Sequence, residues 1–168
     1  MKVINPPAIR RRFEVTFPSV AIETTANYDQ TIAQVMLDRS IIALQTERDS
    51  NGSAWAAPAA FANFGVKLLN ATTARLVAQN TYLNAGGGSA NMVAQVVEFV
   101  AKPKSLQYAL ANGSNQVSLA KIDPTKAVVI PAFLAAQDNT IYTWSLGATA
   151  LTWSASLASP IAVWVIEF

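Results

Sequence analysis

Apolar and polar residues alternate in short runs along most of the chain, which is the pattern of strands that bury one face. Residues 13–17 (Phe-Glu-Val-Thr-Phe) show it most clearly, and Pro18 ends this run. Clusters of Asn, Asp, Gly and Pro separate the runs and predict turns. The predicted strands are residues 13–17, 20–24, 31–37, 41–45, 66–69, 75–79, 92–100, 106–110, 116–122, 127–133, 141–146, 151–155 and 161–168. Short strands at this spacing predict an all-β fold of the sandwich or barrel type.

The segments between the runs differ in how clearly they can be interpreted. Residues 27–29 (Asn-Tyr-Asp) predict a turn, and residues 38–40 predict a tight connection between two strands. Three glycines at residues 86–88 predict a flexible turn. Residues 54–63, which include Trp55, fit a short helix or an irregular apolar loop equally well.

The two halves of the chain resemble each other. Three pairs of segments match in the same order: 92–99 with 161–168, 69–72 with 146–149, and 37–40 with 122–125. The first pair ends in Val-x-Glu-Phe in both copies. Repeated blocks in a constant order predict tandem copies of one structural unit. We therefore predict two tandem small antiparallel β-sandwich or barrel-like units, residues 13–101 with longer loops and residues 104–168, connected by a linker.

The first twelve residues differ from both units. Pro6 and Pro7 fix an extended backbone and cannot donate to a sheet. Arg10, Arg11 and Arg12 follow without a neighbouring acid. Residues 1–12 therefore predict an extended N-terminal arm that docks on an acidic patch of a neighbouring subunit; ordinary solvation and phosphate contacts are the alternatives. Three adjacent cations without interleaved aromatic residues do not predict a nucleic-acid partner.

The second half resembles modules of virion proteins of tailed bacteriophages. The resemblance rests on Ile122-Asp123-Pro124-Thr125-Lys126 followed by Ala127-Val128-Val129, and on the closing Val163-Trp164-Val165-Ile166-Glu167-Phe168. In those modules a V-D-P-x-K-x-x-V strand pair and a W-x-V-x-E-F strand frame a small β-sandwich; in this chain Trp164 stands three residues before Glu167, one fewer than in that strand. The first half departs from this pattern, because Gln95 replaces the tryptophan and no Pro or Lys follows Asp38 in that spacing. The resemblance implies a structural protein of the virion, assembled in the host cytoplasm.

Composition narrows the classes of function. Charged residues make up 13% of the chain against roughly 25% in an ordinary soluble domain, while hydrophobic residues make up 52%. So little charge indicates that apolar surface is covered by neighbouring subunits, as in a homo-oligomer. The chain has no cysteine and no histidine, which removes the thiolate nucleophile, the most frequent general base and most transition-metal ligands. No apolar run is long enough to predict a membrane span.

Catalytic and cofactor motifs are absent from the sequence, so we predict no enzyme, no metal and no cofactor. The glycines at residues 86–88 are not framed by the strand and helix that a phosphate loop needs. Asp38 and Asp123 fit a turn in which a carboxylate accepts from its own backbone. Glu98 and Glu167, at matched strand ends, fit exposed edge residues or partners of a cation.

Four tryptophans are the remaining candidates for binding: Trp55, Trp144, Trp153 and Trp164. Strand tryptophans usually serve the core or a subunit interface, but aromatic rings also stack on sugars. We therefore expect a non-enzymatic virion component that binds copies of itself and a major virion protein of the capsid or tail, with capsid decoration or cementing as the first location. The alternative is a tail, baseplate or fibre adhesion module that binds a host-surface glycan.

Overall fold

The chain is built almost entirely from β-strands. The computed structural model describes residues 8–21, 26–49, 63–79, 89–111, 115–133, 143–154 and 161–168. Its strands are β1 (Ile9–Ala21), β2 (Ala26–Thr31), β3 (Ser40–Asp49), β4 (Asn63–Asn70), β5 (Thr73–Gln79), β6 (Ser89–Phe99), β7 (Ser105–Ala111), β8 (Gln116–Ser118), β9 (Ala127–Phe133), β10 (Trp144–Leu146), β11 (Ala150–Trp153) and β12 (Ile161–Glu167). Two short 3₁₀ helices, η1 (Leu37–Arg39) and η2 (Pro124–Lys126), precede β3 and β9. The predicted all-β class is confirmed.

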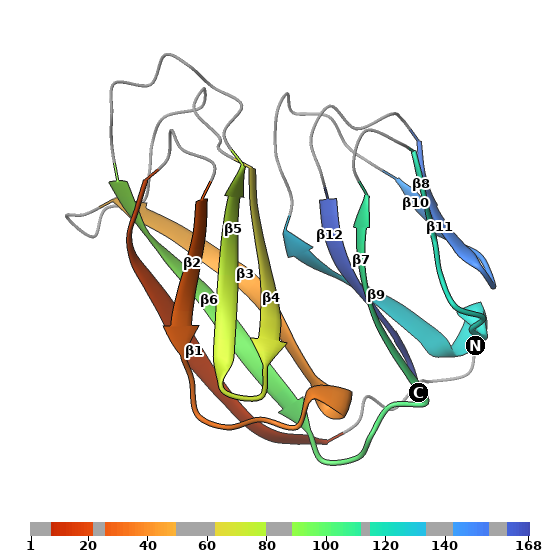
Figure 1. Cartoon of the computed structure of the whole chain (residues 1–168). Helices are drawn as coiled ribbons and strands as arrows, with labels where there is room; N and C mark the ends of the chain where they lie inside the picture. The colour runs from red at the N-terminus through yellow and green to blue at the C-terminus, as the bar shows by residue number, and fades with distance from the viewer. Residues whose placement is uncertain are drawn as a thin grey trace.

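The described strands form four antiparallel sheets of three strands each (Figure 1). Sheet A has the order β1-β6-β3 and sheet B the order β2-β5-β4. Sheet C has the order β7-β12-β9 and sheet D the order β10-β11-β8. If β7 is counted as the first strand of the second half, that half has the same strand order as the first half. The helix η2 also lies at the place that corresponds to η1. The chain is therefore two tandem small β units, β1–β6 and β7–β12, as predicted.

The same backbone hydrogen bonds recur in both units. Ile32 N donates to Thr72 O at 2.9 Å, and Leu119 N donates to Thr149 O at 2.8 Å. Val35 N and Ile122 N likewise donate to the preceding residues of these two turns, Ala71 and Ala148. In each unit the chain before the 3₁₀ helix is thus tied to a turn of the neighbouring sheet.

These bonds explain why two strand predictions are wrong. In the predicted strands 31–37 and 116–122, backbone amides donate to the carbonyl oxygens of a turn instead of a neighbouring strand. Only Thr31 and Gln116–Ser118 pair with a strand. Ile32 and Val35 are buried three residues apart, and Leu119 and Ile122 repeat that spacing. The predicted turn at 27–29 is also wrong, because these residues pair with β5 inside β2.

Strand β1 is longer at both ends than the sequence indicates. Ile9, Arg11 and Arg12 already pair with β6, so the predicted arm does not extend to residue 12. Val20, expected in a second strand, lies in the last part of β1 after a register shift. Pro6 and Pro7 lie outside the described residues, as do the glycines 86–88 and most of residues 54–63.

Sheet C joins the two units into one packed structure. Alternate side chains of β12 face opposite ways: Ala162, Trp164 and Ile166 belong to the core of the first unit. Val163 and Val165 pack with sheet D in a second core. Sheet C accordingly lies between the first unit and sheet D in Figure 1. Both of its faces are covered within the same chain.

A hydrogen bond and an aromatic pair mark the contact between the units. Trp164 Nε1 donates to the carbonyl oxygen of Ile42 in β3 at 2.7 Å. The ring of Tyr108 in β7 packs edge-on against Trp164 at 5.1 Å, and burial raises the pKa of Tyr108 to about 12. None of the helices in the described ranges is long and apolar enough to span a lipid bilayer.

Candidate functional site

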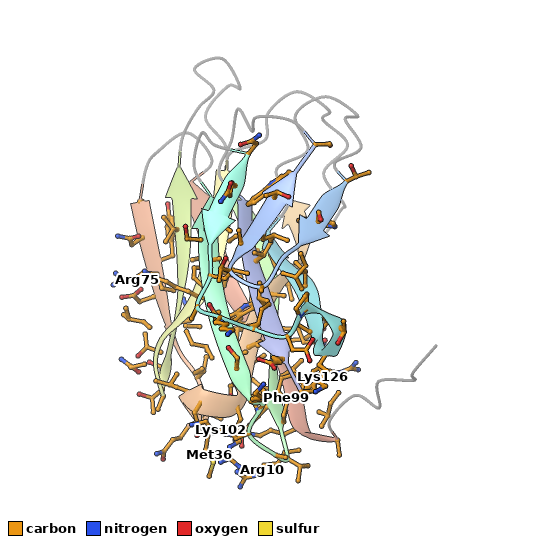
Figure 2. All side chains as sticks on the ribbon, turned by 90° about the vertical axis from the view of Figure 1, so that its right-hand side faces the viewer. Arg10, Met36, Arg75, Phe99, Lys102 and Lys126 are labelled. Atoms are coloured by element: carbon orange, nitrogen blue, oxygen red, sulfur yellow. The ribbon has the colours of Figure 1, made fainter. Side chains whose placement is uncertain are left out.

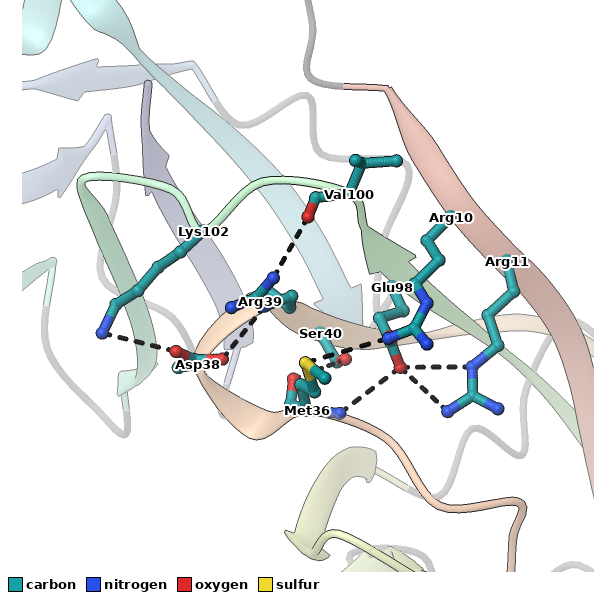
Figure 3. A network of polar contacts seen from close by, with 9 residues as sticks. All are labelled: Arg10, Arg11, Met36, Asp38, Arg39, Ser40, Glu98, Val100 and Lys102. Atoms are coloured by element: carbon teal, nitrogen blue, oxygen red, sulfur yellow. Dashed lines mark hydrogen bonds and ion pairs between the residues drawn. The ribbon is translucent and has the colours of Figure 1, made fainter.

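Glu98, near the end of β6, is fully buried and accepts four hydrogen bonds (Figure 3). Arg10 donates to its Oε1 at 2.7 Å. Arg11 donates to Oε2 through Nε at 3.1 Å and through a terminal nitrogen at 2.9 Å. The backbone amide of Met36 donates to Oε2 at 3.3 Å. An ionised carboxylate offers about four acceptor sites, and the protein places three donors on Oε2 and one on Oε1.

A β-bulge in β1 brings two consecutive arginines to the same carboxylate. Residues next to each other in a strand normally point to opposite faces of the sheet. Here Ile9 lies opposite Phe99 and Arg11 lies opposite Glu98, so Arg10 is the extra residue. A bulge of this kind redirects side chains, and both guanidinium groups reach Glu98.

The ion cluster controls the charge of Glu98. Burial raises the pKa of this carboxyl, but hydrogen bonds from Arg11 and from the Met36 amide outweigh it and hold the pKa below its usual value of 4.5. The Arg11 guanidinium also lies 5.6 Å above the centroid of the Phe13 ring, which fixes its plane. Glu98 is therefore ionised at neutral pH and orients both arginines.

A second set of contacts attaches η1 to the end of β6 (Figure 3). Asp38 pairs with Arg39 at 3.3 Å and with Lys102 at 3.4 Å. Arg39 also donates to the carbonyl oxygen of Val100 at 3.1 Å. Desolvation raises the pKa of Asp38, but its two cationic partners lower it by more. The expected turn role of Asp38 is thus wrong; its carboxylate serves ion pairs.

Beside this cluster the surface is hollowed and exposes apolar side chains. A hollow of about 340 Å³ is lined by Arg10, Arg11, Gln34, Val35, Met36 and Glu98. The side chains of Arg10 and Arg11 are 52% and 36% exposed. Large apolar side chains exposed on the adjoining β1, η1 and β6 ends are Ile9, Met36, Leu37 and Val100. We call Ile9, Arg10, Arg11, Met36, Leu37 and Val100 the arginine end.

The second unit has the same buried glutamate in different surroundings. Glu167 is 1% exposed and lies opposite Ser105, where Glu98 lies opposite Arg11. Among the described residues its one cation is Lys104, whose Nζ lies 2.5 Å from Oε1, and this hydrogen bond raises the pKa of Lys104. The sequence left two interpretations of these glutamates, exposed edge residues or partners of cations. The structure shows that both are partners of cations.

The sheet registers define which residues correspond. Ser40 and Ala127 lie opposite the two glutamates, so Met36 corresponds to Asp123 and Leu37 to Pro124. The match of 37–40 with 122–125 read from the sequence is therefore shifted by two residues. Asp123 accepts from Thr125 N at 3.0 Å, which confirms its predicted turn role.

Both glutamates lie at the same end of the molecule. The rings of Phe99 and Phe168, which follow them, meet edge-to-face at 6.3 Å. Figure 2 shows Arg10, Met36 and Lys102 gathered at this end, with Lys126 near them. Arg75, paired with Asp29, lies away from it on the side of the molecule.

Of the remaining predicted site residues, only Trp144 and Trp153 are brought together in the described part of the chain. Arg12 is exposed and makes no ion pair within the described part of the chain. Trp153 and Trp164 are 5% and 7% exposed and belong to the two cores, and Trp144 is half-buried opposite Trp153. Trp55 lies outside the described residues. The sequence pointed to the arginines but not to the apolar side chains of Met36 and Leu37, which were expected in a strand.

Among the described residues no group of three or more acidic side chains is placed to hold a metal ion. No family model, no curated protein and no solved structure matches the chain.

Proposed function

We propose that this chain is a non-enzymatic structural protein of a tailed-phage virion, and that it attaches to a larger virion protein through the arginine end. The resemblance of residues 122–129 and 163–168 to virion modules supports the kind of particle. Capsid decoration or cementing is the first location, and the tail or baseplate is the second. The tandem sandwiches supply a rigid body that presents this end.

The observation that carries the proposal is the difference between equivalent ends of two copies of one fold. The first unit exposes Met36 and Leu37 where the second has Asp123 and Pro124, and it has Arg11 where the second has Ser105. In the second unit one lysine, Lys104, is enough to pair with the buried glutamate, so the fold itself does not need two arginines there. The additional arginine and apolar side chains therefore serve something other than the fold.

The composition of the arginine end is that of a protein–protein interface. Arginine and methionine are enriched in such interfaces, whereas aspartate is depleted. Met36 is 45% and Leu37 is 46% exposed, and covering such side chains contributes roughly 25 cal/mol per Å² of apolar area removed from water. A contact repeated by the symmetry of a particle sums these small gains without any catalytic step.

Co-sedimentation tests the proposal. The chain is mixed with particles of its encoding phage that were assembled without it, and the pelleted fraction gives an apparent Kd. We expect binding that Met36→Ser weakens about tenfold, the equivalent of about 1.4 kcal/mol. Leu69→Ser is the matched control because Leu69 is similarly exposed, at 41%, but lies in sheet B and does not line the hollow. A chain that does not pellet, or equal losses in both variants, contradicts the proposal.

A further inference from the structure

The two arginines of the hollow keep donors that nothing in the described part of the chain uses. A guanidinium carries five N–H donors. Arg10 uses one terminal nitrogen, towards Glu98 and the Met36 sulfur. Arg11 uses Nε and one terminal nitrogen. Nε and the second terminal nitrogen of Arg10, and one terminal nitrogen of Arg11, thus have no protein acceptor there.

The hollow also carries an excess of positive charge. Two arginines face one glutamate, whose two oxygens already accept four bonds from Arg10, Arg11 and the Met36 amide. The carboxylate therefore acts as a positioning residue that holds both guanidinium planes. An incoming anion would meet preorganised donors and lose little side-chain entropy on binding.

We infer that this hollow binds the carboxylate of an acidic side chain in a partner protein, set in an otherwise apolar segment. The inference rests on the proposed function and names the chemistry of the partner at the same site. Arg10 and Arg11 match the planar carboxylate, and Met36 in the wall of the hollow covers apolar neighbours. A nucleic acid fits less well, because its phosphates would also lie against the apolar side chain of Met36.

The equivalent place in the second unit shows what such a site requires. There Asp123 replaces Met36 and puts a carboxylate beside Lys104, with which it interacts favourably. Ser105 replaces Arg11. The second unit therefore has no excess of positive charge beside Glu167, and we expect an acidic segment to bind to the first unit only.

Arginine side-chain NMR tests the inference on the intact chain. The Nε–H signals of Arg10 and Arg11 are followed while a short capped peptide with one Glu among leucines, in a Gly-Ser frame, is added. We expect both signals to shift and those of Arg12 and Arg75 to stay. The same peptide with Gln for Glu is expected to bind about tenfold more weakly, since a charge-assisted hydrogen bond is about twice as strong as a neutral one.

Two variants with the same change of charge complete the test. Arg10→Gln leaves Glu98 with both bonds from Arg11, so the fold persists and peptide binding should fall about tenfold. Arg12→Gln on the same strand should bind like the unaltered chain. Equal binding of the Glu and Gln peptides, or equal losses in the two variants, overturns the inference.

Two further outcomes also overturn it. Inorganic phosphate that shifts the Arg10 and Arg11 signals at the same concentration as the peptide would show a general anion site. Shifts that depend on protein concentration without peptide would identify a second copy as the occupant. The inference can fail while the proposed function holds. If Met36→Ser weakens pelleting but Arg10→Gln does not, the proposed function is kept and the carboxylate site is rejected.

Discussion

At the scale of single residues, the most informative group is a buried carboxylate that accepts four hydrogen bonds and is paired with two arginines. The sequence showed Glu98 in a repeated Val-x-Glu-Phe ending, with an exposed edge residue and a partner of a cation as its two interpretations. Its burial follows from its place in the central strand of sheet A, between β1 and β3. The sequence could not show that two adjacent arginines reach it, because strand alternation assigns them to opposite faces and the bulge at Arg10 overrides that rule.

Acid should weaken the fold through this group. A carboxyl whose pKa is lower in the folded chain than in the unfolded chain adds stability above the unfolded value and loses it as the pH falls through the folded value. For Glu98 the loss of stability begins as the pH falls below about 4.5, the ordinary pKa of the carboxyl in the unfolded chain. Urea unfolding at several pH values measures it.

The variant Glu98→Gln isolates the contribution. It leaves two half-exposed arginines without their counter-ion, so we expect a loss of about 1–3 kcal/mol at neutral pH, less than the ~3–5 kcal/mol of a fully buried pair. We expect its stability to fall less steeply than that of the unaltered chain below pH 4.5. Arg12→Gln, whose charge does not contact Glu98, should keep the original pH dependence; parallel curves for Glu98→Gln and the unaltered chain contradict the assignment.

At the scale of elements, the periodic strands were predictable and the connections tied to turns were not. The prediction for β9 has the observed bounds, residues 127–133, and β12 differs only at its last residue. The failures at residues 31–37 and 116–122 occur at equivalent places in the two units. There the apolar residues that anchor the chain to a turn imitate a strand, because local sequence does not reveal where an amide finds its acceptor.

Equivalent strands also differ for a reason that only the packing shows. Trp164 in β12 occupies the place of Gln95 in β6. The Trp164 face of sheet C is buried against the first unit, whereas Gln95 is only partly buried. The first half therefore departs from the W-x-V-x-E-F pattern at Gln95, on a sheet face that is less buried than the equivalent face of sheet C.

The two buried indoles of the second unit give a matched comparison of this contact. Trp164 donates to Ile42 across the units, whereas Trp153 Nε1 is buried without a partner among the described residues. Both Phe substitutions remove similar volume, but only Trp164→Phe breaks a hydrogen bond. We expect Trp164→Phe to cost about 1 kcal/mol more than Trp153→Phe in the free energy of unfolding. Equal costs in urea titrations would show that the bond to Ile42 adds nothing.

At the scale of the whole molecule, the first unit covers an apolar face of sheet C in the second unit. The sequence showed a chain poor in charge, and we expected neighbouring subunits to hide its apolar surface. Part of that surface is hidden within the chain, because both faces of sheet C are buried. Composition alone therefore does not require a homo-oligomer, and the argument for a partner rests on the arginine end, where cationic and apolar side chains remain exposed together.

A cryo-electron microscopy map of the native assembly tests this claim most directly. The account predicts density from another protein over the arginine end, with an acidic side chain of that protein against Arg10 and Arg11. A map in which Met36, Leu37 and both arginines face solvent while a different surface of the chain is covered would contradict it.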